Sequence, residues 1–313
     1  MIIPVVAAVL RDDRGRVLLA QRPVGKHLAG TWEFPGGKLE PDESAEQGLV
    51  RELAEELAIA VDQSEPLLSL THHYPGRSVR LLLREVSAWQ GRPVGREGQA
   101  LAWVSLAEAQ RLPMPPADRP MLKALALDPR LSISPDPSGF AAPDAFLDDW
   151  RARLEAGFGW LGLPAGGPAT AGLHSLIERC CTLAHDFGAR CSLLAPPRDL
   201  ATALPAYGIH LDTDQLRACR RRPLAADRLV TADCETAEDL ALAGRLGLDL
   251  VMVGPICSPL SDPLPLGWSG LEECCADSPL PVLATGGLGP EDLAQARHAG
   301  AFGVAGSDRF GGS

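Results

Sequence analysis

Three carboxylates on one face of a short helix constrain this chain more than any other feature of its sequence. Ser44 is a suitable N-cap, and the apolar residues after it recur at helical spacing, so a helix is expected to begin there. Glu52, Glu55 and Glu56 are three and four positions apart and share one face of that helix. Adjacent carboxylates repel one another, and Mg²⁺, a hard cation that prefers oxygen ligands, would relieve the repulsion. A solvated acidic face is the alternative interpretation.

The spacing of the residues around this helix favours the metal site. From Gly37 to Ile59 the sequence follows the pattern Gly-x5-Glu-x7-Arg-Glu-Leu-x-Glu-Glu-x-x-Ile. The pattern resembles the Nudix box, with Ala58 at the position where that family usually has Gly. The resemblance implies an N-terminal α/β/α sandwich with a mixed sheet, and a hydrolase that uses Mg²⁺ or Mn²⁺. We expect Arg51, which lies inside the box, to hold a glutamate in place by bidentate pairing.

Beyond the box, residues 1–130 are similar to the MutT-type 8-oxo-dGTP diphosphatases. The similarity includes Glu-Phe-Pro-Gly-Gly at 33–37, Arg-Glu-Gly-Gln at 96–99 and Pro-Pro-Ala-Asp-Arg-Pro at 115–120. It implies a nucleotide-binding set that comprises Arg22, His27, Glu33, Phe34, Pro35, Gly36 and Asp118. It also implies a metal-binding and catalytic set that comprises the Gly36 carbonyl, Glu52, Glu55, Glu56 and Glu97, with Arg51 as their support.

These two sets predict the hydrolysis of a nucleoside triphosphate, 8-oxo-dGTP or another oxidised purine nucleotide, to the monophosphate and pyrophosphate. Metals held by the glutamates would activate water, and either a free carboxylate of the cluster or Glu97 would be the general base. Asp118 stands where the bacterial pattern usually has Asn. An ionised Asp only accepts hydrogen bonds, whereas a protonated one also donates, so a wider set of oxidised purines is permitted. A cytidine nucleotide or a thiamine-pathway pyrophosphate is the alternative substrate.

The charge and cysteine content restrict the partners and the location of the protein. The formal net charge is −11, with 16 Lys+Arg against 17 Asp+Glu in residues 1–130 and 13 against 23 in residues 131–313. Neither part has the basic surplus that binding a nucleic-acid polymer requires. The sequence shows no secretory signal and no apolar run of membrane length. All eight cysteines follow residue 179 without a Cys-x-x-Cys pair, which favours reduced thiols in a cytoplasmic protein. Nothing in the sequence indicates a particular oligomeric state.

A second domain is expected after a Pro-, Asp- and Ser-rich connection, with the boundary between residues 1–130 and 131–313. Strand and helix patterns alternate eight times beyond that boundary, which is the order of a compact (β/α)8 TIM barrel. The expected strands are 131–134, 158–163, 189–194, 208–211, 228–232, 248–253, 281–284 and 302–305. The whole chain is therefore predicted to join two α/β domains of different architecture.

The second domain is similar to the thiamine phosphate synthase and TenI family. The similarity rests on Gly-Ile-His-Leu at 208–211, Val-Gly-Pro at 253–255, Pro-Leu-Gly-Trp at 265–268 and Ala-Thr-Gly-Gly at 284–287. A phosphorylated small molecule could bind at the late glycine-rich loops, which supply Gly286, Gly287, Gly306 and Ser307.

The same domain departs from that family at the positions that grip pyrophosphate. The last lysine of the chain is Lys123, and the two basic segments of the synthases are replaced by residues 160–164 and 258–263. We therefore expect a ligand-binding, sensor or degenerate domain and no active synthase.

Overall fold

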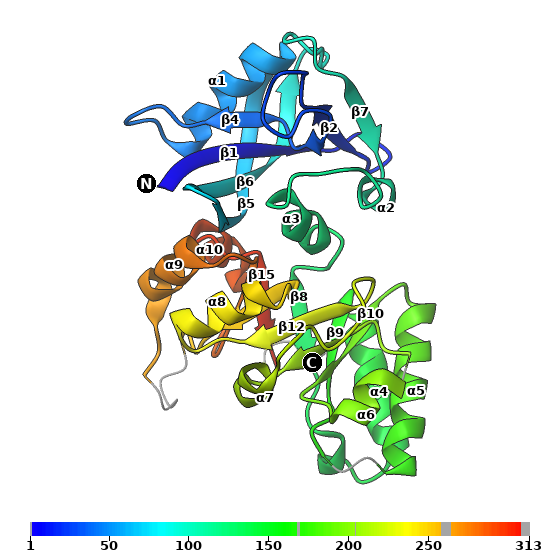
Figure 1. Cartoon of the computed structure of the whole chain (residues 1–313). Helices are drawn as coiled ribbons and strands as arrows, with labels where there is room; N and C mark the ends of the chain where they lie inside the picture. The colour runs from blue at the N-terminus through cyan, green and yellow to red at the C-terminus, as the bar shows by residue number, and fades with distance from the viewer. Residues whose placement is uncertain (1, 168–169, 204, 258–263, 308–313) are drawn as a thin grey trace. The chain divides into compact units, whose positions relative to one another are not determined.

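The computed structural model describes residues 2–167, 170–203, 205–257 and 264–307. The chain forms two compact units, Met1–Ala126 and Leu127–Ser313 (Figure 1). Each unit contains its own buried hydrophobic core.

The N-terminal unit is built on a mixed sheet with the strand order β4-β1-β6-β5. Strand β1 runs parallel to β6 and antiparallel to β4, and β5 runs antiparallel to β6. A second, antiparallel sheet has the order β3-β2-β7. The bounds are β1 (Ile2–Leu10), β2 (Val17–Gln21), β3 (Trp32–Glu33), β4 (Gly36–Lys38), β5 (Ala60–Tyr74), β6 (Arg77–Gln90) and β7 (Leu101–Val104).

The helix expected after Ser44 is present as α1 (Ala45–Leu57). Ser44 and Gln47 form a capping box, in which the Gln47 amide donates to Ser44 Oγ at 3.2 Å and the Ser44 amide donates to Gln47 Oε1 at 2.9 Å. The helix ends at Ala58, whose φ of 57° lies in the left-handed region that favours glycine.

Helix α1 packs on the sheet through its buried leucines. Leu49, Leu53 and Leu57 join Val6 and other residues of β1 and β6 in one hydrophobic cluster. Figure 1 shows α1 on the opposite side of β1 from α3 (Asp118–Ala124); α2 (Leu106–Ala109) follows β7. Because successive side chains of a strand alternate between its two faces, the neighbours of Val6 in β1 are free to line a site on the other face.

The β5–β6 hairpin is longer than the sequence predicts. The apolar patterns predict strands over 66–72 and 79–88, whereas the strands cover 60–74 and 77–90. The added residues of β5 are mostly polar, so they carry no alternating apolar signal. A bulge between Pro66 and Leu68 lets β5 continue past a proline, which cannot donate to the ladder.

The C-terminal unit is a closed barrel of parallel strands in the order β8-β9-β10-β11-β12-β13-β14-β15, which confirms the predicted fold class. The strands are β8 (Arg130–Ile133), β9 (Trp160–Pro164), β10 (Arg190–Leu194), β11 (Gly208–Leu211), β12 (Leu229–Asp233), β13 (Leu250–Val253), β14 (Val282–Thr285) and β15 (Gly303–Gly306). The helices are α4 (Pro143–Glu155), α5 (Ala171–Asp186), α6 (Arg198–Ala203), α7 (Thr213–Ala218), α8 (Ala237–Arg245), α9 (Gly267–Asp277) and α10 (Leu293–His298).

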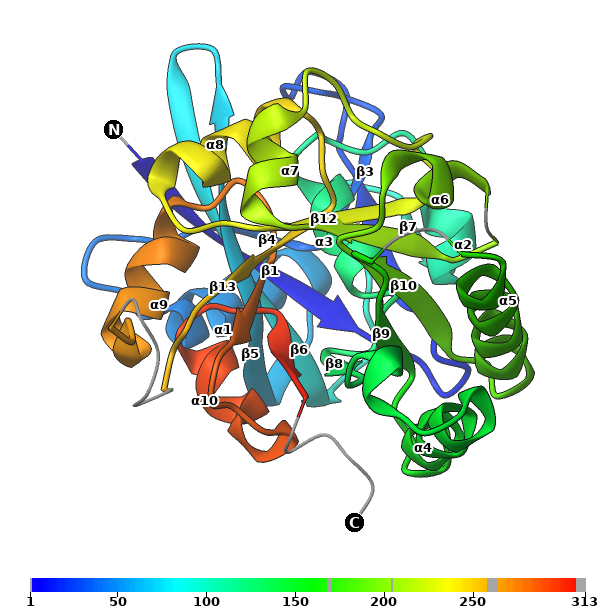
Figure 2. The same cartoon turned by 90° about the horizontal axis from the view of Figure 1, so that it is seen from below.

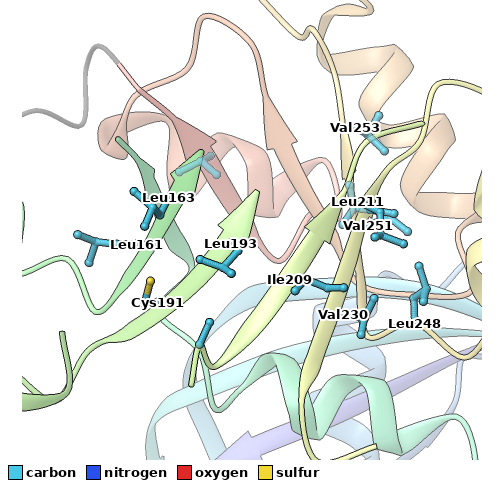
Figure 3. Close-up of a cluster of buried hydrophobic side chains, with 14 of the residues drawn as sticks. Leu161, Leu163, Cys191, Leu193, Ile209, Leu211, Val230, Leu248, Val251 and Val253 are labelled. Carbon is cyan, nitrogen blue, oxygen red and sulfur yellow. The ribbon is translucent and has the colours of Figure 1, made fainter. Parts of the chain in front are cut away.

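The barrel core lies between the strands and the surrounding helices. Figure 2 shows α4 and α5 outside β9 and β10, and Figure 3 shows the apolar strand side chains of this layer, among them Leu193, Ile209 and Val251. Phe146 and Trp150 of α4 belong to the same cluster. Residues that alternate with these on the strands point to the barrel interior.

The eight cysteines, all of which lie within the described residues, form no disulfide, and four of them are buried, namely Cys180, Cys191, Cys234 and Cys275. Over the described ranges, no helix has both the length and the apolar character needed to cross a bilayer.

Candidate active site

A cavity of about 490 Å³ lies in the N-terminal unit and gathers segments that are far apart in the sequence. Ten of the predicted site residues line it, namely Arg22, His27, Glu33, Phe34, Pro35, Gly36, Glu52, Glu56, Glu97 and Asp118. Ile3 and Val5 of β1 and Val79 and Leu81 of β6 form its apolar floor. Acidic groups and an apolar floor therefore share one pocket.

Two of the three α1 glutamates that were predicted to bind the metal reach this pocket. Glu52 and Glu56 line it, whereas Glu55 lies outside the lining with 62% of its side chain exposed. Arg51 contacts Glu52 at 2.9 Å and Glu55 at 3.4 Å, so it links the two. The three glutamates that were expected to share one helical face therefore differ in environment: two line the pocket and one is exposed to solvent.

Arg51 supports the box from outside the pocket. Its bidentate partner is Glu43, which accepts from Nε and Nη2 at 2.9 Å each, and Nη2 also donates to the Lys38 carbonyl at 3.0 Å. The Arg51–Glu52 contact is a single hydrogen bond. Arg51 therefore ties the start of α1 to β4 while it orients Glu52.

Glu56 is the most strongly perturbed glutamate of the pocket. Burial raises its pKa to about 7, and the negative charges of Glu52, Glu97 and Glu33 act in the same direction. The Gly36 amide donates to Glu56 Oε2 at 3.4 Å and opposes the shift. Gly36 has a φ of 144°, and a side chain there would lie 2.2 Å from the Val6 carbonyl oxygen, so only glycine fits beside β1.

The loop that carries Glu97 is docked on the end of α1. The Glu56 carbonyl accepts from the Arg96 amide at 2.9 Å and from Gln99 Nε2 at 3.1 Å. Gln99 Oε1 in turn accepts from the Glu97 amide at 2.8 Å. Lys26 reaches Glu97 Oε2 at 2.5 Å from the loop on the other side of the pocket.

Asp118 also lines the pocket. It is the first residue of α3, is 7% exposed, and accepts a hydrogen bond from the Phe34 amide. Burial raises the pKa of Asp118 to about 8, and the nearby Glu33 carboxylate adds to this rise. Asp118 is therefore mostly protonated at neutral pH and can both donate and accept.

Lys26, Tyr74, Arg77 and Gln99 are among the lining residues that were not predicted from the sequence. Tyr74 and Arg77 lie at the tip of the β5–β6 hairpin; the Arg77 guanidinium lies 5.6 Å from the Tyr74 ring centroid, and the His27 ring lies edge-on to Tyr74 at 6.3 Å. The only sign of Tyr74 and Arg77 in the sequence was an aromatic residue beside a Pro-Gly turn. That pattern is typical of many hairpins and does not by itself indicate a binding site.

The donors of the pocket fit a hard divalent cation by their chemistry. Glu52, Glu56 and Glu97 supply carboxylates, and Gly36 supplies a carbonyl. A Cβ atom at position 37 would lie 2.3 Å from the Glu52 carboxylate, so the absence of a side chain at Gly37 leaves space for this carboxylate. Among the side chains that the structure describes, no three His, Cys, Asp or Glu converge on a single point. Glu52 is turned to Arg51 and Glu97 to Lys26, so cation binding requires these side chains to reorient.

Each of the two units matches a known protein family. Residues 1–125 match the NUDIX domain model, and residues 138–310 match the thiamine monophosphate synthase model. The chain is 48% identical over 122 residues to the CTP pyrophosphohydrolase of Escherichia coli (strain K12), an alignment that covers 39% of this chain and 90% of that protein. The chain belongs to the Nudix family and, through its barrel, to the thiamine monophosphate synthase family.

Other relatives match either unit. The Nudix unit is 34% identical to the 8-oxo-dGTP diphosphatase of Escherichia coli (strain K12) over 121 residues, which cover 39% of this chain and 94% of that protein. A bifunctional thiamine biosynthesis protein of Symbiobacterium thermophilum is 34% identical over 209 residues, which cover 63% of this chain and 40% of that protein.

The barrel places its predicted phosphate residues at the C-terminal ends of two paired strands. Gly286 and Gly287 follow β14 with φ of 87° and 75°, while Gly306 ends β15 and Ser307 follows it. Residues 258–263, where a basic loop of the synthases is replaced, lie outside the described residues. The phosphate site of the barrel therefore stays a prediction.

Proposed function

We propose that the Nudix unit hydrolyses a nucleoside triphosphate to the monophosphate and pyrophosphate, with Mg²⁺ or Mn²⁺ and with 8-oxo-dGTP as its preferred substrate. This reaction would remove an oxidised nucleotide before it is incorporated mutagenically. The observation that carries the proposal is one cavity whose lining contains the Glu52, Glu56 and Glu97 carboxylates together with the buried carboxyl group of Asp118, whose pKa is raised by burial. Its relatives include proteins named for both 8-oxo-dGTP and CTP hydrolysis.

Asp118 would select the base by its hydrogen-bonding pattern. The 8-oxoguanine edge presents an N7–H donor beside the O6 acceptor, whereas the same edge of guanine presents two acceptors. A protonated Asp118 accepts from N7–H and donates to O6, and the Phe34 amide keeps its carboxyl group oriented. The apolar floor from Val5 and Leu81 would support the flat face of the base.

The glutamates would act at the phosphate end. A divalent cation held by Gly36, Glu52, Glu56 and Glu97, with Glu55 in reach from the helix surface, would neutralise the phosphates and lower the pKa of the attacking water. Glu56, with its pKa raised to about 7 by burial, suits proton transfer near neutral pH. Arg51 donates to Glu52 Oε1, a contact that cation binding would change, and Arg22 is paired with Glu33 at the pocket wall.

A cytidine nucleotide is the second candidate substrate. The relative named for CTP is 48% identical, against 34% for the relative named for 8-oxo-dGTP. The N3 and N4 edge of cytosine also places an acceptor beside a donor, so a protonated Asp118 can pair with it. The two substrates therefore share the edge that this pocket can bind.

Product analysis tests the reaction class. Wild-type protein with Mg²⁺ and 8-oxo-dGTP should release 8-oxo-dGMP and pyrophosphate, resolved by ion-exchange chromatography. Release of the diphosphate and inorganic phosphate would contradict the proposed position of attack.

For the barrel we propose a ligand-binding or sensor role and no synthase activity. The absence of lysine after Lys123 supports this, because the synthases use lysines to hold pyrophosphate. Residues 1–130 alone should retain full hydrolysis, and the full chain should form no thiamine phosphate from a pyrimidine pyrophosphate and a thiazole phosphate. Formation of that product would refute the proposal.

A further inference from the structure

Lys26 lies on a loop that is held in a defined conformation beside the phosphate end of the pocket. The Arg22 amide donates to the Thr31 carbonyl at 2.9 Å and the Gly30 amide donates to the Arg22 carbonyl at 3.0 Å, which close the loop. Arg22 Nε donates to the His27 carbonyl at 2.7 Å inside the loop. These bonds fix the backbone from which the Lys26 side chain enters the lining of the pocket.

The contact between Lys26 and Glu97 joins two partly exposed side chains. Lys26 Nζ lies 2.5 Å from Glu97 Oε2, and the two side chains are 51% and 45% exposed. Ion pairs with this exposure contribute little to stability, because solvent screens the charges and the two side chains lose rotamer freedom when they pair. The contact is therefore weak enough for another charged group to replace either partner.

Lys26 also stands in the field of the carboxylates assigned to the cation. Its Nζ contacts Glu97, and both residues line the pocket together with Glu56. An ammonium group has three donors, so Lys26 can contact an anion while it remains near Glu97. Arg22, by comparison, is already bonded to Glu33 and to the His27 carbonyl, and Arg77 lies over the Tyr74 ring.

We propose that Lys26 binds the phosphate oxygens of the nucleotide and competes with the divalent cation for the Glu97 carboxylate. The inference rests on the proposed function, because it assigns a phosphate-binding residue to the same site. A cation that takes Glu97 releases the ammonium group, and the incoming phosphates supply its new partner. Lys26 is thus a substrate-binding residue whose removal should change cation binding and nucleotide binding in opposite directions.

The test compares Lys26→Gln with wild type in the full chain by two measurements. Mn²⁺ affinity without nucleotide, measured by electron paramagnetic resonance, should rise about two- to fivefold in the variant, because a competitor with the strength of an exposed ion pair is removed. KM for 8-oxo-dGTP at saturating Mg²⁺ should rise about tenfold with kcat nearly unchanged, because a charge-assisted contact to phosphate is lost. Lys26→Arg should restore both values most of the way.

Arg14→Gln is the matched control, because it removes a positive charge from an exposed turn outside the pocket. It should leave both values unchanged. A fall of Mn²⁺ affinity and kcat together in Lys26→Gln would overturn the proposal, since it would show that Lys26 only holds Glu97 in place. An unchanged KM would contradict the phosphate role. If wild type hydrolyses no nucleotide, the proposed function fails, while the Mn²⁺ comparison still decides the competition.

Discussion

Gln99 joins the two carboxylate-bearing segments of the pocket through the backbone of Glu56. Its Nε2 donates to the Glu56 carbonyl at 3.1 Å, and its Oε1 accepts from the Glu97 amide at 2.8 Å. The end of α1 and the Glu97 loop are thereby held in one arrangement, although they are more than 40 positions apart. The position of Glu97 relative to Glu56 therefore depends on a side chain that does not itself carry charge.

Replacement of Gln99 by Ala should lower kcat about tenfold and leave KM within about twofold, because supporting residues orient ligands without binding substrate. Steady-state kinetics with 8-oxo-dGTP measure this. Gln90→Ala is the control, since Gln90 bonds only exposed Asp62 among the contacts seen in the described residues. Equal losses in both variants would show that Gln99 has no special role.

Glu56 and Glu55 should differ sharply despite their adjacent positions. Glu56→Gln should lower kcat/KM at least about a hundredfold, because it removes a pocket carboxylate assigned to the cation. Glu55→Gln should cost less than about tenfold, because Glu55 is exposed and outside the lining. The reverse order would mean that α1 presents a different face to the substrate.

The pH profile should report the protonation of Asp118. Its pKa is raised to about 8, so the carboxyl group holds its proton at pH 7 and loses it as the pH rises through 8. The ionised form cannot donate to the base. The ratio of kcat/KM for wild type to that for Asp118→Asn should therefore fall above pH 8, because Asn keeps a donor and an acceptor throughout. A ratio that stays constant from pH 6 to pH 9.5 would rule this role out.

Ala58 should carry a measurable backbone strain. Its φ of 57° costs a non-glycine residue about 1–2 kcal/mol. Glycine avoids this cost, but it loses more conformational entropy on folding, which offsets part of the gain in stability. Ala58→Gly should therefore stabilise the Nudix unit by about 0.5–1 kcal/mol, measured by urea unfolding of residues 1–126. Ala54→Gly, on the exposed face inside α1, should instead destabilise it by about 1 kcal/mol.

The secondary structure that depends on residues close together in the sequence was predictable from the sequence alone. Ser44 and Gln47 form their capping box through residues three positions apart, and the apolar face of α1 is visible in the sequence alone. The barrel followed from the alternation of strand and helix patterns, since each strand must be followed by a crossover helix to pair in parallel. Ala58 was visible as a departure from the Nudix pattern at a turn.

Contacts between distant segments were not predictable in the same way. The Arg51 side chain was expected to pair bidentately with a glutamate, and the structure gives this partner as Glu43. The Lys26 contact with Glu97 and the Gln99 contact with Glu56 depend on how loops dock, which no single segment encodes. Tyr74 lines the pocket at the end of β5, two residues beyond the strand end that the apolar pattern predicts.

The central claim is that this pocket selects an oxidised purine and uses its glutamates to hydrolyse the triphosphate. The most direct measurement is kcat/KM for 8-oxo-dGTP, dGTP, 2-hydroxy-dATP and CTP with Mg²⁺, in wild type and in Glu56→Gln. We expect a preference for 8-oxo-dGTP over dGTP of at least about a hundredfold in wild type, and loss of activity in the variant. Slow hydrolysis of all four at similar rates, or full activity in Glu56→Gln, would contradict it.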